Sequence, residues 1–162
     1  MATTDTAWTK VAAELKTVLV AAAAAALRDI KFFTSADRTD MEPLTDAEIP
    51  GVIIGVAKVD FDYSEEHGQM RHTAQLIFSV QSGIETGLSI DPSNQDIVAF
   101  IVEILAASDD LNGMVEFLDP VSADASEQAA PDIGEALLIF ECTLYTPTND
   151  FRTIIARGGV HL

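Results

Sequence analysis

The stretch Val59–Gly83, VDFDYSEEHGQMRHTAQLIFSVQSG, decides the fold because it contains two alternating patterns separated by a polar turn. In the first pattern, Val59, Phe61 and Tyr63 alternate with polar residues, which is typical of a half-buried β-strand. The alternation resumes after a turn that contains Gly68. The apolar positions of this second pattern are Ala74, Leu76, Phe78 and Val80. Two such strands joined by a short turn predict a β-hairpin.

A long amphipathic helix is predicted before the hairpin, over residues 5–31. Its apolar residues recur at steps of three and four, which is the period of one helix face. These residues are Trp8, Val11, Leu15, Val18, Leu19, Ala22, Ala26 and Ile30. The run Ala21–Ala26 favours a helix and adds little bulk, so we expect a thin helix that lies on a sheet.

A second helix is predicted to begin at Asp91-Pro92-Ser93, where a capping residue precedes a proline suited to the first helical turn. Its segment Ile97–Leu105 is apolar nearly all round. Such a helix should be covered on more than one side. The sheet is one cover, and the other is either the first helix or a neighbouring subunit.

Two further strands complete the predicted fold. One lies around Val115–Val121, and after a loop from Ser122 to Gly134 a dense apolar strand runs over Ala136–Tyr145. The first strand of the hairpin begins at Val52. The sequence therefore predicts one α+β domain over residues 1–147, with an antiparallel or mixed four-strand sheet and both helices on one face. Residues 148–162 have no clear periodicity and are interpreted as a C-terminal arm.

The composition limits the possible partners. The chain has 162 residues and a formal charge of −17, which argues against a surface that binds nucleic acid phosphates or anionic lipid. The uncharged run Thr17–Leu27 is shorter than the roughly 20 residues of a membrane span, so we expect no membrane association and a cytoplasmic location.

No residue pattern points to catalysis or to a cofactor. The chain has no phosphate-binding glycine motif. His67 and His72 flank the hairpin turn, where exposure to solvent is more common than metal binding. Cys142 lies in the most apolar strand, where an inert buried thiol is expected. We therefore expect neither an enzyme nor a metal or cofactor site.

The charges are unevenly distributed along the chain. Residues 72–151 contain many Asp and Glu residues but no Lys or Arg. One interpretation is general solubility, and the other is a surface that repels polyanions.

The order of the segments resembles the tail terminator, or tail completion, proteins of tailed phages, a group that includes the lambda minor tail protein U and its counterparts in contractile tails. The resemblance covers residues 8–147. It rests on the helix ending LRDIKFF, the strand entry EIPGVII, the hairpin, the helix segment DIVAFIVEILAASDDLNGMVEF and the closing strand EALLIFECTLYTP.

The resemblance implies a structural virion protein at the head-proximal end of the tail, assembled in the host cytoplasm. Such proteins form a ring, usually of six copies, that caps the tail tube, stops its polymerisation and docks the head connector. The implied partners are further copies of the chain, the tube protein, the neck connector and, in a contractile tail, the sheath. Genomic DNA would pass through the ring without specific binding.

Three other interpretations remain open. One is a different neck component such as a connector adaptor or stopper, the second is a stand-alone binding module, and the third is a small hydrolase or lyase. Under the terminator interpretation, two regions are predicted to make contacts between subunits or rings: the hairpin end and the arm. Their residues are Glu65, Glu66, His67, Gly68, Gln69, Arg71, Phe151, Arg152, Ile154, Ile155 and Arg157. A frayed terminus is the alternative for the arm.

Overall fold

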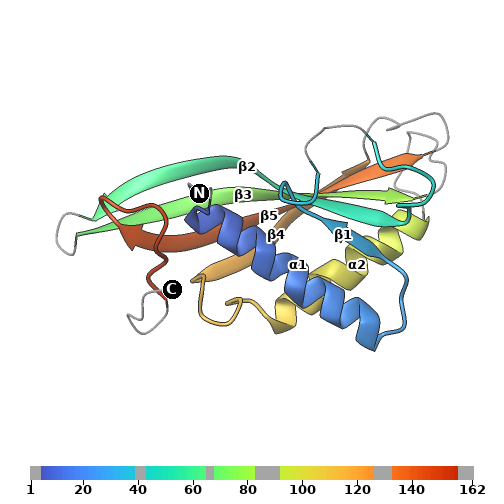
Figure 1. Ribbon diagram of the computed structural model, residues 1–162, viewed down its shortest axis with the longest axis horizontal. Helices are drawn as coiled ribbons and strands as arrows, with labels where there is room; N and C mark the ends of the chain where they lie inside the picture. The colour runs from blue at the N-terminus through green and yellow to red at the C-terminus, as the bar shows by residue number, and fades with distance from the viewer. Residues whose placement is uncertain (1–4, 39–42, 65–67, 83–91, 126–132, 157–162) are drawn as a thin grey trace.

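The computed structural model contains the 162-residue chain, and the structure describes all residues except 1–4, 39–42, 65–67, 83–91, 126–132 and 157–162. The described part has two helices and five strands (Figure 1). In chain order they are α1 (Ala7–Ala25), β1 (Lys31–Phe33), β2 (Gly51–Ser64), β3 (Gln69–Ser82), α2 (Pro92–Ala107), β4 (Phe117–Ala125) and β5 (Gly134–Pro147).

The sheet has the strand order β1-β2-β3-β5-β4. β1 is parallel to β2, and all other neighbouring strands are antiparallel, so the sheet is mixed. The predicted α+β class and the hairpin of β2 and β3 are confirmed. The prediction of four strands was wrong by one, because β1 is only three residues long and begins at Lys31, the last residue assigned to the first helix.

The first helix is shorter than predicted. α1 begins after Thr6, whose side chain accepts a hydrogen bond from the backbone N–H of Thr9, and it ends at Ala25. Leu27 then adopts a left-handed conformation with φ of 56°, and the N–H of Arg28 donates to the carbonyl of Ala23. This Schellman-type ending turns the chain back, so that Lys31 and the next two residues pair with β2 instead of extending the helix.

Both helices pack on the same face of the sheet, as predicted (Figure 1). α1 contacts β1 and β2, whereas α2 contacts β3, β4 and β5. The two helices also contact each other, so the sheet and α1 are the two covers that the apolar sequence of α2 requires. The core between the layers contains large buried side chains such as Leu15, Phe78, Ile101 and Phe140.

β4 is longer than the sequence predicted. It continues to Ala125, through residues that were assigned to a loop starting at Ser122. Most of its residues are exposed, and the pairing with β5 shifts register between Pro120 and Ser122. An exposed edge strand with a bulge lacks the regular apolar alternation on which the prediction depended.

No helix among the described residues is long and apolar enough to span a membrane.

Candidate functional site

The hairpin end is the first of the two predicted contact regions. Glu65, Glu66 and His67 lie outside the described residues. Gly68 is exposed with φ of 61°, and its carbonyl accepts a hydrogen bond from the N–H of Thr148. Gln69 begins β3 and is half-buried, whereas Arg71 is exposed. The chain that follows β5 therefore supports the hairpin end.

The arm is the second predicted region, and through Ala156 the structure places it on its own chain. The carbonyl of Phe151 accepts a hydrogen bond from the N–H of Ala7, and the N–H of Ile155 donates to the carbonyl of Tyr145. Ile154 is fully buried in the core. This segment is therefore packed and not frayed.

Arg152 is held against the chain in the same way. The guanidinium of Arg152 donates to the carbonyl of Asp5 at 2.8 Å, and Lys10 donates to the carbonyl of Arg152 at 2.6 Å. These bonds fasten the arm to the first turns of α1. Arg157 lies outside the described residues.

His72 was expected near an exposed tip, and this expectation was wrong. Its side chain is only 1% exposed, because it shares the helix-facing side of β3 with Ala74 and Leu76. The alternation along this strand was the sequence signal that could have placed it in the core.

The surroundings of His72 fix its protonation. Trp8 donates its indole N–H to Nδ1 at 3.1 Å, so the proton of the neutral ring lies on Nε2, which donates to Oγ1 of Thr146 at 2.9 Å. The rings of Phe61 and Phe151 lie edge-on to the imidazole. Burial lowers the pKa of His72 below its ordinary value of 6.5. The ring is therefore a structural, uncharged link between α1, the sheet and the arm.

Exposed aromatic residues surround this end of the sheet. The sequence prediction had assigned Phe61 and Tyr63 only to strand alternation, whereas Phe151 was predicted to make contacts as part of the arm. Phe61 is 52% exposed and stacks on Phe151, with ring centroids 5.5 Å apart. Tyr63 is 65% exposed one step closer to the turn. The end of the hairpin projects beyond α1 (Figure 1), so these side chains form an accessible apolar surface.

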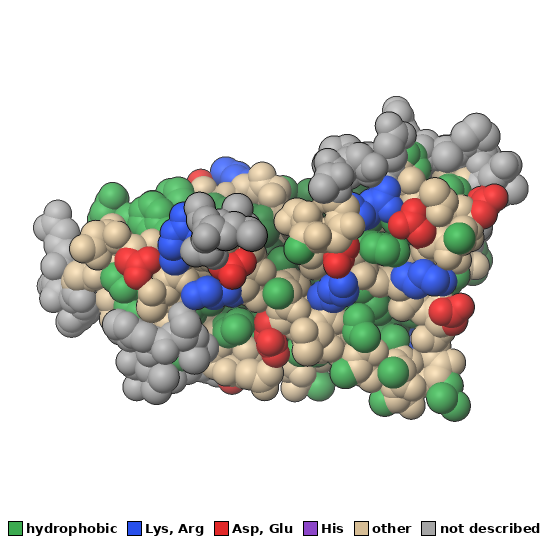
Figure 2. All heavy atoms as spheres, in the orientation of Figure 1, with side chains coloured by type: hydrophobic (Ala, Val, Ile, Leu, Met, Phe, Trp, Pro, Cys, Tyr) green, Lys and Arg blue, Asp and Glu red, His purple; other side chains and the backbone are tan. Residues whose placement is uncertain are grey.

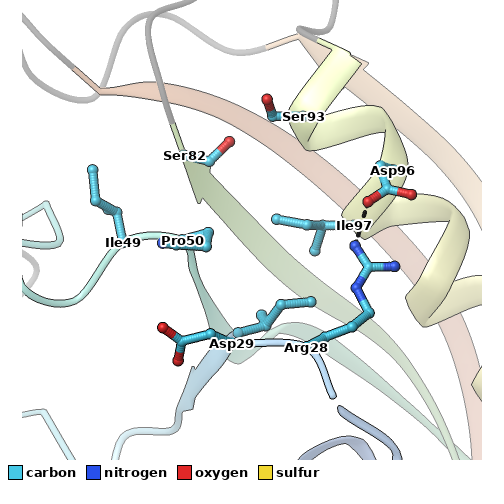
Figure 3. A pocket seen from close by; sticks show the side chains of 9 residues that line it. Arg28, Asp29, Ile49, Pro50, Ser82, Ser93, Asp96 and Ile97 are labelled. Atoms are coloured by element: carbon cyan, nitrogen blue, oxygen red, sulfur yellow. Dashed lines mark hydrogen bonds and ion pairs between the residues drawn. The ribbon is translucent and has the colours of Figure 1, made fainter. Parts of the chain in front are cut away.

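A hollow of about 530 Å³ lies near the other end of the sheet, between the α1–β1 link, Pro50 and the first turns of α2 (Figure 3). Arg28 forms an ion pair with Asp96 across it, and the guanidinium lies 4.8 Å from the centre of the Phe100 ring. Ile97 and Pro50 supply apolar lining. Asp29 also lines the hollow, so one basic and two acidic side chains surround it.

The charge asymmetry along the sequence is also an asymmetry in space. The half of the sheet formed by β5 and β4, together with α2, carries acidic side chains and no basic ones. The exposed acids there are Asp96, Glu103, Asp119, Asp124 and Glu141. The described Lys and Arg residues lie on α1, β1, β2, the start of β3, the loops beside α1 and the arm, and several are visible on the α1 side of the molecule in Figure 2. We call the surface of α2, β4 and β5 the acidic side.

The described residues contain no group of three or more His, Cys, Asp or Glu residues that could hold a metal ion. Cys142 is fully buried, as predicted, and burial raises its pKa to about 12. A thiol with that pKa is not a nucleophile at neutral pH.

Comparison with known proteins adds no family assignment. The chain matches no protein-family model, and no curated protein sequence matches it.

Proposed function

We propose that this chain is a structural virion protein of a tailed phage, a tail terminator whose copies form a ring on the head-proximal end of the tail tube. The proposal combines the resemblance in segment order with one structural observation. That observation is the separation, on one small domain, of a projecting aromatic hairpin end from an acidic side without bases.

The two surfaces suit the two tasks of a terminator. A protein that stops tube growth needs one surface that binds the tube, and exposed aromatic side chains such as Phe61 and Tyr63 are typical of protein contacts. The ring also surrounds the path of the genome. An acidic side that faces this path would keep DNA from adhering to it.

The experiment is a mass measurement of the chain by native mass spectrometry, alone and with tail tubes of the same phage. We expect a ring, or a monomer that becomes a ring only at tube ends. Tyr63→Ser should weaken tube binding at least tenfold, because Tyr63 is 65% exposed at the hairpin end. Val121→Ser is the matched control, since Val121 is 58% exposed on β4. A monomer that ignores tubes would refute the proposal.

The role of the acidic side is tested separately with Asp119→Lys and Asp124→Lys, which reverse two exposed charges on β4. We expect rings that still cap tubes but retain DNA, with a retention that weakens as salt rises. Unchanged DNA delivery by phage carrying both substitutions would remove the acidic side from the proposal.

The hollow in Figure 3 favours one alternative, a stand-alone binding module for a small ligand. Its volume is within the range of small-molecule sites, and its lining mixes apolar and charged groups. The same mass measurement separates the two functions, because a ligand-binding module has no reason to assemble on tubes.

A further inference from the structure

His72 lies where four parts of the chain meet. Trp8 of α1 donates its indole N–H to Nδ1, and Nε2 donates to Oγ1 of Thr146 on β5. The rings of Phe61 on β2 and Phe151 in the arm lie edge-on to the imidazole, with centroids 4.9 and 5.6 Å from its own. All four neighbours are uncharged, so none of them can balance a positive charge on the imidazole.

The charged groups on these packed elements are directed elsewhere. Lys10 of α1 donates to the carbonyl of Arg152, and Arg152 donates to the carbonyl of Asp5. In the arm, Asp150 accepts from the N–H of Arg152 at 2.9 Å and from the hydroxyl of Thr153 at 2.6 Å. The titratable residues of β2, β3 and β5 near the ring lie on the opposite face of the sheet, because they alternate with Phe61, His72 and Thr146; they are Asp60, Asp62, Arg71 and Tyr145. Among the described residues, His72 therefore has no carboxylate partner.

A proton on Nδ1 creates two faults at this junction. It places an N–H of the imidazole opposite the indole N–H of Trp8, so two donors meet without an acceptor. It also places a cation in a site that is only 1% exposed to solvent. β3 pairs along its length with β2 and β5, which fixes the position of the ring in the sheet. The protonated ring can therefore reach water only if the neighbours that cover it move away.

The arm covers His72 with few backbone bonds. The carbonyl of Phe151 accepts from the N–H of Ala7 at 2.9 Å, and the N–H of Ile155 donates to the carbonyl of Tyr145 at 2.8 Å. Ala7 adjoins Trp8, so displacement of the indole disturbs the first of these bonds. The burial of Ile154 opposes release and keeps the arm in place while His72 is neutral. Segments held by few backbone bonds open before the paired strands of a sheet do.

We propose that protonation of His72 releases residues 148–156, the described part of the arm, while the sheet remains folded. Release brings the imidazole into contact with water and removes Phe151 from its stack on Phe61. The aromatic surface at the hairpin end then grows on the side that the arm now covers. The arm is thus a pH-sensitive strap over the hairpin end, and this device does not depend on the ring proposed above.

Amide hydrogen exchange, followed by NMR from pH 8 to pH 5, tests this release. The amides of Ala7 and Ile155 report on the arm, because they form the two backbone bonds described above. The amides of Leu76 and Phe140, which are paired on the central strands β3 and β5, report on the sheet. At each pH the protection factors of the arm amides should be lower than those of the sheet amides by about a hundredfold or more.

The pH dependence of the arm amides is the sharper part of the test. Between pH 6.5 and the lowered pKa of the buried ring, their protection factors should fall by about tenfold per pH unit, because release is linked to the uptake of one proton. In His72→Gln the protection factors should not change with pH, since glutamine keeps both hydrogen bonds without titrating. The matched control His67→Gln/His161→Gln removes the other two histidines and should keep the wild-type slope.

Trp8→Phe is a second test that leaves His72 in place. It removes the donor opposite Nδ1, so proton uptake no longer breaks a hydrogen bond. The fall in protection of the Ile155 amide should therefore span a narrower pH range than in wild type. An unchanged pH range in this variant would contradict the role of the indole.

Three results would overturn the inference. Protection of Ala7 and Ile155 equal to that of the sheet amides would show that the arm opens only when the whole domain unfolds. Protection of the arm amides that does not vary with pH in wild type would show that the arm opens without His72. A slope that persists in His72→Gln would assign the proton uptake to another group.

Discussion

The indole nitrogen of Trp8 lies 3.1 Å from Nδ1 of His72, and this bond joins residues 64 positions apart in the chain. It connects the first turn of α1 to the middle of the sheet beside the arm. Because Trp8 is the only tryptophan of the chain, its fluorescence reports directly on this connection. The bond also requires that Nδ1 be unprotonated.

We therefore expect acid to lower the free energy of unfolding over a pH range that is set by the pKa of His72. The folded pKa is lowered by burial, whereas the unfolded chain titrates near 6.5. Between these two pKa values the unfolded state binds more protons than the folded state. The contribution of His72 to the free energy of unfolding is therefore fully present above about pH 6.5 and is lost as the pH falls through the folded pKa. Trp8 fluorescence and urea unfolding measured from pH 8 to pH 5 should show this loss.

His72→Gln is the control, because an amide can accept from Trp8 and donate to Thr146 but does not titrate. Its stability should be flat across the same window. The carboxyls of Asp37, Glu48 and Asp150 have pKa values held below 3.8, 4.5 and 3.8, mainly by hydrogen bonds from Lys16, Thr45 and Thr153 respectively. Their stabilising contributions are lost only at lower pH. An equal loss of stability between pH 8 and pH 5 in wild type and His72→Gln would contradict the assignment of this pH dependence to His72.

The arm should stabilise the domain to which it belongs. Ile154→Ala removes a fully buried side chain from the core and should lower the free energy of unfolding by about 3 kcal/mol. Ile155→Ala, at a half-buried position, should cost less than half as much. Urea unfolding measures both. A negligible effect of Ile154→Ala would mean that the arm is not bound to its own chain in solution.

Gly51 is required by a close approach of the backbone. A Cβ at this position would lie 2.6 Å from the carbonyl oxygen of Glu48 and 2.7 Å from a methyl group of Leu44. Gly51→Ala should therefore destabilise the fold by about 2 kcal/mol. Gly55→Ala is the matched control on the same strand, because a Cβ there meets nothing within 4 Å. Thermal unfolding of the two variants should separate them, and equal midpoints would contradict the packing around Leu44.

Leu27→Gly should stabilise the free chain, which is unusual for removal of a large side chain. Leu27 has φ of 56° and buries almost nothing, so glycine relieves the left-handed strain at no packing cost. We expect a gain of about 1 kcal/mol in the free energy of unfolding of the dilute protein. Leu27→Ala is the control and should give little gain, because alanine keeps the Cβ. A loss of stability in Leu27→Gly would mean that Leu27 is packed in the free chain.

Local patterns in the sequence determined the hairpin, the second helix, the strand over Ala136–Tyr145 and the α+β class. The hairpin has a period of two, whereas the second helix and the last strand were predicted from a capping signal and from dense apolar runs. All of these signals are visible without knowledge of the partner. The burial of Cys142 was predicted for the same reason, from the apolar density of its strand. The acid-only composition of residues 72–151 was also evident from the sequence.

Only the tertiary structure decided the features that depend on distant partners. β1 exists because three residues pair with β2, and the alanine run before it favours helix continuation on local grounds. His72 is buried because α1 and the arm cover it from segments 64 and 79 positions away. The exposure of Leu27 likewise arises from how the layers are stacked. A single sequence shows the period of each segment, but which face remains uncovered is set by packing between segments.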